Sequence, residues 1–287
     1  MRGAILCALT SLCFLLPQQN ACGQDWEQLK SEHFIVYFTN DPGFAKNVLD
    51  KSEYYYKRIA GDLGYARYSE FWTWDNRVKI YIYPDHKSFI SATHQPYWSQ
   101  GMADYRGKKI ISYAWSKGFV ESLLPHEMAH LIFRDFVGFK GEVPLWLDEG
   151  IAQWAEKPDR NYIKAMASQA YKDNLVLPLE EMMVLDVRKI RADESIYINT
   201  VTTNDNRKGV LFLSGEKLVN AFYLQAVSLV DFLIVRFGSE KFIELCRQLR
   251  DGKSLEEALR FVYPMHIRSI AELDNEWRKY LEEKNNG

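Results

Sequence analysis

The sequence has little cysteine. It contains four cysteines in 287 residues, and Cys7, Cys13 and Cys22 all stand near its beginning. If that beginning is a processed leader, the mature chain keeps Cys246 alone, which excludes a fold held by intramolecular disulfides. Cys246 lies in an apolar helical pattern, where we expect the thiol to pack as a small buried hydrophobic side chain.

A surplus of positive charge is also missing. Lys plus Arg total 36 and Asp plus Glu total 38, giving a net charge of −2, which argues against nucleic acid as the main partner. The sequence shows no internal repeat and no low-complexity segment. Its composition, 47% hydrophobic and 26% charged, argues against a disordered, collagen-like or coiled-coil protein. A chain of this length can build a large core without disulfides.

Long hydrophobic runs are scarce, and the most apolar uncharged one lies at Ala4–Leu16. Its thirteen residues, at about 1.5 Å each, fall short of a hydrocarbon core about 30 Å thick, so we expect no stable membrane span after processing. A positive charge before the run and small residues after it are typical of a secretory signal. We therefore predict that residues 1–23 are a signal peptide and that the protein is exported to the periplasm or the extracellular space. A lipoprotein anchored through Cys22 is the alternative, although Gln19 stands where a lipobox expects Leu.

Hydrophobic periodicity changes along the chain. Strand alternation occurs at His33–Thr39, Val78–Tyr83 and Lys109–Tyr113. A helix is expected at Ala45–Leu63, after a turn at Asp41–Gly43, and a shorter one after the N-cap Asp85. After Tyr113 helical periods dominate, at Phe119–Phe136, Leu145–Ala155, Asn161–Tyr171, Val219–Phe237, Glu240–Arg250, Leu255–Phe261 and Ile270–Lys284. This order predicts an α+β fold, with a mixed sheet and helix half at 24–135 and a mainly helical half at 136–287. The polar residues 186–214 are expected to form a loop or a hairpin packed over the functional site.

The strongest motif is Pro125-His-Glu-Met-Ala-His130. On a helix, His126 and His130 differ by about 40° around the axis, so both imidazoles project from one face. That spacing suits two nitrogens on one tetrahedral Zn²⁺. Glu127 points about a quarter turn away, where it can accept a proton from zinc-bound water. Because the chain has only six histidines, a chance match to this motif is improbable.

A third ligand is predicted in the segment LWLDEGIA. Glu149 follows His130 with eighteen residues between them, and Pro144 is well placed to begin a helix that carries it. Two histidines and one carboxylate leave the fourth position of a zinc ion open, which is typical of a catalytic site. The neighbouring Asp148 fits the spacing less well. It is expected to support the ligands or to stabilise the helix start through the dipole.

The motif resembles that of the gluzincin metallopeptidases, and among them the peptidase MA-like group of exported peptidases. It consists of HEMAH, followed after eighteen residues by the Glu of WLDEGIA. The close match covers about His126 to Glu156, and a looser one runs from Trp26 through the C-terminal helices. The resemblance implies one Zn²⁺ per chain held by His126, His130 and Glu149, with Glu127 as general base. It also implies a thermolysin-like catalytic unit, in which a mixed sheet lies beside the active-site helix and a helical part follows.

Gluzincins commonly add a Tyr or His that stabilises the oxyanion of the reacting carbonyl. The resemblance places this role at Tyr223, with Tyr197 and Tyr105 as the alternatives. A phenol can donate a hydrogen bond to developing negative charge while it stays protonated at neutral pH.

The segment Gln100–Asp104 precedes the metal motif by about 25 residues. In the family, an edge strand at this place pairs with the substrate backbone. Asp104 occupies the slot of the Glu that holds the substrate amine in aminopeptidases, but the rest of that motif is absent, which argues against aminopeptidase specificity.

The other histidines and the aromatic clusters have simpler interpretations. His33, His86, His94 and His266 have no partner at metal-ligand spacing and are expected at the surface or at helix caps. The clusters Trp72-Thr-Trp74 and Tyr97-Trp98 are expected to pack in the core or in loops, and the alternative is that they line a peptide groove.

These residues predict an exported zinc metallopeptidase that acts on a peptide or protein substrate. Two alternatives remain open: a catalytically silent zinc-bearing scaffold, and a metal-dependent hydrolase of a non-peptide substrate such as an ester or a cell-wall amide. Glu127 argues against the scaffold, because a structural zinc site needs no base. The sequence does not predict cleavage preference or oligomeric state.

Overall fold

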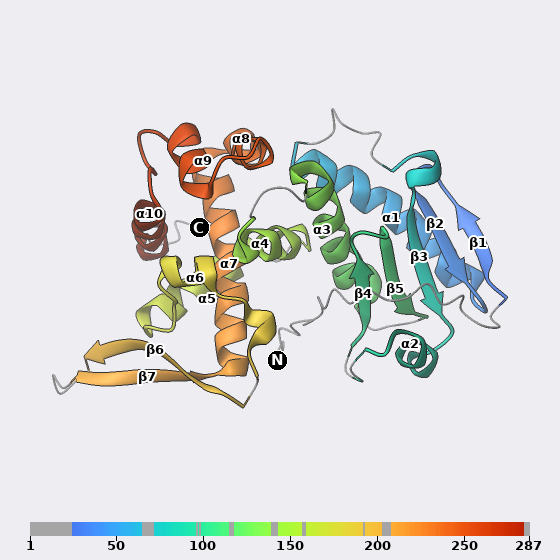
Figure 1. Cartoon of the computed structure of the whole chain (residues 1–287), viewed down its shortest axis with the longest axis horizontal. Helices are drawn as coiled ribbons and strands as arrows, with labels where there is room; N and C mark the ends of the chain where they lie inside the picture. The colour runs from blue at the N-terminus through green and yellow to red at the C-terminus, as the bar shows by residue number, and fades with distance from the viewer. Residues whose placement is uncertain are drawn as a thin grey trace. The chain divides into compact units, whose positions relative to one another are not determined.

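The computed structural model describes residues 25–64, 72–95, 97, 99–114, 118–138, 143–156, 159–191, 193–202 and 208–283, of which residues 195–211 are described by their backbone alone. The predicted signal peptide, with Cys22, lies outside these residues. The chain divides into two compact units after Asp135 (Figure 1). The first holds a five-stranded sheet with helices and the second is mainly helical, so the predicted α+β class is confirmed.

The sheet of the first unit is mixed. Its strands are β1 (Glu27–Lys30), β2 (Phe34–Phe38), β3 (Val78–Tyr83), β4 (Gly101–Asp104) and β5 (Lys109–Tyr113). They lie in the order β1-β2-β3-β5-β4, where the three inner strands are parallel and the two edge strands are antiparallel to their neighbours. The strands predicted at β2, β3 and β5 are confirmed, and β4 is an edge strand, as expected.

One face of the sheet packs against helix α1 (Pro42–Asp62) (Figure 1). Phe34, Val36 and Phe38 alternate onto that face and are buried, as the period of two in the sequence predicted. The turn predicted at Asp41–Gly43 is wrong. Asp41 is the N-cap of α1 and its side chain accepts a hydrogen bond from the backbone N–H of Phe44 at 2.8 Å, so the helix begins at Pro42.

Edge strand β4 is packed closely against the segment that leads into the metal-motif helix. A π-turn at Phe119–Leu123 precedes α3 (Leu124–Val137), so the predicted helix over Phe119–Phe136 is helical throughout but not uniformly α. A Cβ placed on Gly101 would lie 2.5 Å from Leu123 Cδ2, which leaves room for hydrogen alone. Helix α2 (His86–Thr93) begins at the predicted N-cap, Asp85, which accepts from the Ser88 N–H at 2.7 Å.

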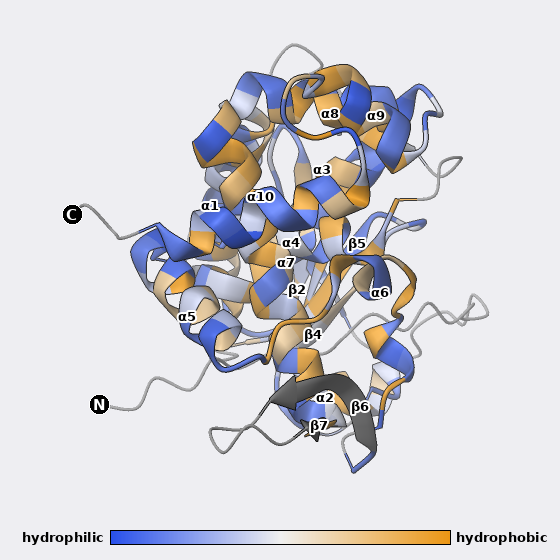
Figure 2. Cartoon of the chain, turned by 90° about the vertical axis from the view of Figure 1, so that its left-hand side faces the viewer, coloured by the Kyte–Doolittle hydropathy of each residue, from blue (hydrophilic) through white to orange (hydrophobic). Residues whose placement is uncertain are grey.

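Helix α7 (Gly215–Phe237) forms the core of the second unit. The other helices there are α4 (Leu145–Ala155), α5 (Arg160–Lys172), α6 (Leu179–Val184), α8 (Ser239–Arg250), α9 (Leu255–Val262) and α10 (Ile270–Glu282). By length and composition α7 is the one helix among the described residues that could cross a membrane. However, 78% of its most apolar 18-residue stretch is buried within the protein, as in the core helix of a globular protein. Figure 2 shows hydrophobic and hydrophilic residues side by side on α8 and α9, as amphipathic packing requires.

Helix α4 approaches α7 closely. A Cβ on Gly150 would lie 2.5 Å from the carbonyl oxygen of Ala226, so backbone meets backbone at this crossing. On the same stretch of α7, the buried amide of Gln225 bonds both the N–H and the carbonyl of Leu177, at 2.9 and 2.8 Å. Ser228 accepts from the indole N–H of Trp277 at 3.1 Å. These contacts fix α7 against the elements around it.

Residues 186–214 contain the hairpin that was one of two predicted outcomes. Strands β6 (Ser195–Thr202) and β7 (Lys208–Ser214) pair antiparallel, with a register shift between Tyr197 and Asn199. A 3₁₀ turn at Val187–Lys189 and the preceding helix α6 were not predicted.

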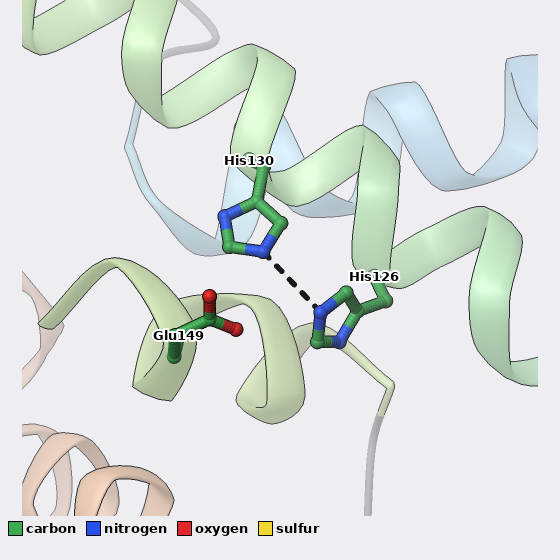
Figure 3. Close-up of side chains that lie close together, drawn as sticks. All are labelled: His126, His130 and Glu149. Atoms are coloured by element: carbon green, nitrogen blue, oxygen red, sulfur yellow. Dashed lines mark hydrogen bonds between the residues drawn. The ribbon is translucent and has the colours of Figure 1, made fainter. Parts of the chain in front are cut away.

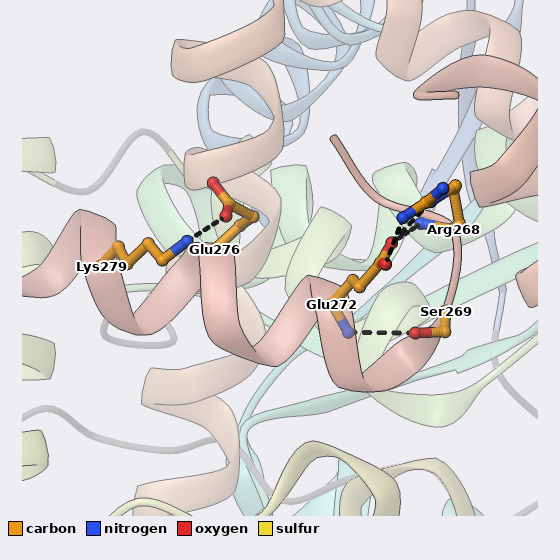
Figure 4. Close-up of polar contacts among 5 residues, drawn as sticks. All are labelled: Arg268, Ser269, Glu272, Glu276 and Lys279. Atoms are coloured by element: carbon orange, nitrogen blue, oxygen red, sulfur yellow. Dashed lines mark hydrogen bonds and ion pairs between the residues drawn. The ribbon is translucent and has the colours of Figure 1, made fainter. Parts of the chain in front are cut away.

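Local polar contacts set the beginning of α10 (Figure 4). The Ser269 hydroxyl accepts from the Glu272 N–H at 3.1 Å, and the guanidinium of Arg268 pairs with the Glu272 carboxylate at 3.0 Å. Further along, Lys279 Nζ lies 2.6 Å from Glu276 Oε1. Because these pairs are largely exposed, we assign them to helix definition rather than to global stability.

A buried carboxylate in α7 gives a testable pH dependence. Burial raises the pKa of Asp231, and the charge of Arg160, 3.6 Å away, offsets only part of that rise. An acid whose pKa is raised by folding destabilises the native state progressively as pH rises above its unfolded value of 3.8. We expect metal-free Asp231→Asn to melt about 2–4 °C higher than wild type at pH 7, the shift that roughly 1 kcal/mol gives at this size.

The gain should largely disappear near pH 3, below the unfolded value of 3.8, where the carboxyl is mostly protonated in both states. Asp251→Asn is the matched control, because Arg250 lowers the pKa of that exposed acid and the predicted sign is reversed. Thermal unfolding at both pH values checks the prediction. A lower melting temperature for Asp231→Asn than for wild type at pH 7 would contradict it.

Candidate metal centre

Helix α3 carries the two predicted histidine ligands and the predicted base. His126, Glu127 and His130 are all buried, with exposed fractions of 8%, 1% and 3%. Every residue from Leu123 to Phe133 is buried, so the motif lies within a wholly buried stretch of chain that is otherwise mostly apolar. Three ionisable side chains in such an environment are costly unless hydrogen bonds or a cation compensate them.

The two imidazoles face each other (Figure 3). Their Nε2 atoms lie 3.2 Å apart, and the ring planes are inclined at 76°. Two nitrogens each about 2.1 Å from a tetrahedral zinc ion lie roughly 3.4 Å apart, so this spacing fits a shared cation.

Glu149 completes a group of three possible ligands. It lies on α4, is 5% exposed, and offers a carboxylate oxygen such that all three donor atoms are within 4.8 Å of one another (Figure 3). This buried group could hold a metal ion, and its two nitrogens and one carboxylate oxygen are donors that suit zinc. The adjacent Asp148 is also buried, in the first turn of α4, where the helix dipole favours an acid.

A guanidinium adds positive charge near these acids. Arg188 is held by Asp186, with Nε 2.7 Å and Nη2 3.0 Å from the two carboxylate oxygens. The Asp186 contact raises the pKa of Arg188, and the charges of Glu149 and Asp148 add to that rise. In turn, the hydrogen bond from Arg188 lowers the pKa of Asp186 to about 2. No pattern in the sequence predicted this pair, which lies within the polar residues 186–214.

Of the three tyrosines considered for the oxyanion, Tyr105 lies within hydrogen-bond distance of the predicted base. Its Oη is 3.3 Å from Glu127 Oε2, and its ring centroid is 5.5 Å from that of His130. Tyr223 is buried on α7, one turn before Ala226 and therefore on the side of α7 that meets α4. Tyr197 lies in β6, of which only the backbone is described.

The remaining histidines do not join the metal group. The expectation of a surface or capping position is wrong for His33, which is buried and whose Nδ1 lies 2.8 Å from Glu53 Oε2. His94 ends α2 in the left-handed region, with φ +56°, as a capping residue does. Trp72 packs in the core, while Trp74 and Tyr97 are exposed. Cys246 is buried in α8, as predicted.

No protein-family model and no curated protein matches this sequence.

Proposed function

We propose that the protein is an exported zinc metallopeptidase whose catalytic unit follows the thermolysin-like gluzincin plan. One observation supports this above all: His126, His130 and Glu149 form a buried group with ligand spacing, next to the buried carboxylate of Glu127. A structural zinc site has four protein ligands and no base, whereas three ligands and a neighbouring carboxylate are typical of hydrolytic sites.

In this proposal the ligands and the base have separate tasks. His126, His130 and Glu149 hold the ion. When bound, Zn²⁺ supplies Lewis-acid polarisation of a scissile carbonyl and lowers the pKa of water at the site. Glu127 accepts a proton from the attacking water and delivers it to the leaving amine nitrogen. Tyr223 donates a hydrogen bond to the carbonyl oxygen as negative charge develops on it, and this stabilises the transition state.

The first test measures metal and turnover on residues 24–287, the predicted mature chain. We expect about one zinc per chain after zinc loading, and cleavage of a peptide library that stops on chelation and returns with zinc. Ester and peptidoglycan substrates are run beside the peptides, so that a non-peptide hydrolase is identified by its substrate. No bound zinc in the folded, zinc-supplemented protein would overturn the proposal. One zinc without any hydrolysis would favour the scaffold.

A further inference from the structure

We infer that Tyr105 is a positioning residue for Glu127: its hydroxyl donates to the carboxylate and fixes the direction in which the base faces. The inference rests on the proposed function, since it assigns a role within that site. It differs from the oxyanion role that the sequence left open for Tyr105, because it acts through the base and not on the substrate.

The geometry is that of a donor against a buried carboxylate. Tyr105 Oη lies 3.3 Å from Glu127 Oε2, and Glu127 is 1% exposed. A phenol O–H donates a hydrogen bond, and a carboxylate oxygen accepts one, so the two groups are complementary at this distance. Its ring also packs against His130, at 5.5 Å between centroids and 62° between planes. The tyrosine is therefore confined between the base and one predicted ligand.

The turn that carries Tyr105 has a well-defined conformation. Tyr105 is the first residue after β4, in the connection to β5. The N–H of Gly107 donates to Asp104 Oδ1 at 2.9 Å, and a Cβ on Gly107 would lie 2.3 Å from Asp104 Oδ2. Lys108 follows with φ +49°, in the left-handed region. The Asp104 carboxylate thus folds the turn upon itself and sets where the Tyr105 side chain leaves the backbone.

A second contact fastens the same turn to α3. Lys108 Nζ lies 2.8 Å from Asp135 Oδ2, and the indole N–H of Trp72 donates to that oxygen at 2.6 Å. Asp135 is eight residues beyond Glu127, which is about 12 Å along a helix. The turn therefore meets α3 at two separated points, Glu127 and Asp135. Two points of attachment resist rotation of the turn about either one, and this keeps the tyrosine aimed at the base.

The kinetic test is Tyr105→Phe in the zinc-loaded mature chain. We expect kcat to fall about 10–100-fold, the usual effect of removing a partner that orients a catalytic group, while KM and zinc content stay at wild-type values. Tyr171→Phe is the matched control, because it removes a phenol that donates to another glutamate, Glu282 Oε1 at 3.1 Å, outside the metal group, and its kcat should be unchanged. An unchanged kcat in Tyr105→Phe, or a loss confined to zinc binding, would overturn the assignment.

A structural test separates this inference from the proposed function. Crystal structures of wild type and Tyr105→Phe should show the Glu127 carboxylate in one orientation in wild type and turned or disordered in the variant. This result does not depend on turnover, so it tests the positioning role even if no peptide is cleaved. An identical, ordered carboxylate in both proteins would contradict the inference. If the wild-type protein neither binds zinc nor cleaves substrate, but the carboxylate is displaced in Tyr105→Phe, the result would contradict the proposed function alone.

Discussion

Glu127→Gln is expected to lower kcat by about 10²–10⁴-fold, the contribution that a general base makes, without releasing the metal. Gln keeps the size of the side chain and its hydrogen-bond acceptor, but it cannot take up the proton of the attacking water at neutral pH. Because Glu127 is buried on α3 next to His126 and is not one of the three predicted ligands, zinc content should stay at the wild-type value. Steady-state kinetics and metal analysis on the same preparation measure both quantities.

Glu121→Gln is the matched control for this substitution. Glu121 is exposed in the π-turn that precedes α3, so the same chemical change there should leave kcat and zinc content unaltered. Wild-type rates in Glu127→Gln would falsify the assignment of the base. Loss of zinc from Glu127→Gln would instead show that the carboxylate is a ligand.

The second large effect is expected for Glu149→Ala, which should weaken zinc binding by about 100-fold or more. Removing a residue that merely orients a ligand typically costs 10–100-fold, and removing the ligand itself should cost at least as much. The variant should also lose the stabilisation that zinc gives the folded chain, which is about 2.7 kcal/mol at a zinc concentration 100 times Kd. Zinc titration against a competing chelator, and thermal unfolding with and without zinc, check the two results.

Asp148→Ala provides the comparison, since it removes the adjacent buried acid of the same helix turn. We expect a smaller loss of zinc affinity there. The opposite ranking, with Asp148→Ala losing zinc and Glu149→Ala retaining it, would transfer the ligand role to Asp148.

The sequence predicted the elements whose local pattern is strong. Strand β2 alternates cleanly, α2 has an Asp N-cap, and the bounds of α4 were predicted to the residue because Pro144 favours its start. Strand β1 and helix α6 were missed. Their segments, EQLK and LEEMMV, are too short to show a period, and they are fixed by pairing or packing with residues far away in the chain.

The same limit applies to the site. The spacing of His126, His130 and Glu149 predicted that they share one location, because helix geometry is local and one reversal brings the third residue back. The contact of Tyr105 with Glu127 joins a strand end to a helix 22 residues later. The sequence offered Tyr105 only as an alternative for the oxyanion role, and no local pattern indicated its contact with the base. The pairing of Arg188 with Asp186 lies close in sequence, but its position near Glu149 depends on how the second unit folds.

The close crossing at Gly150 has a consequence for how α4 can move. Because the hydrogen of Gly150 faces the Ala226 carbonyl, any larger side chain there would act as a wedge that forces α4 away from α7. Glu149 immediately precedes Gly150, so its carboxylate would move with α4 if the helix were displaced. Helices α4 and α7 are thus in close backbone contact, with Glu149 on one helix and Tyr223 on the other. We expect a substitution in the core of α7 beside Ala226 to displace both the predicted metal ligand and the proposed oxyanion donor, without touching either side chain.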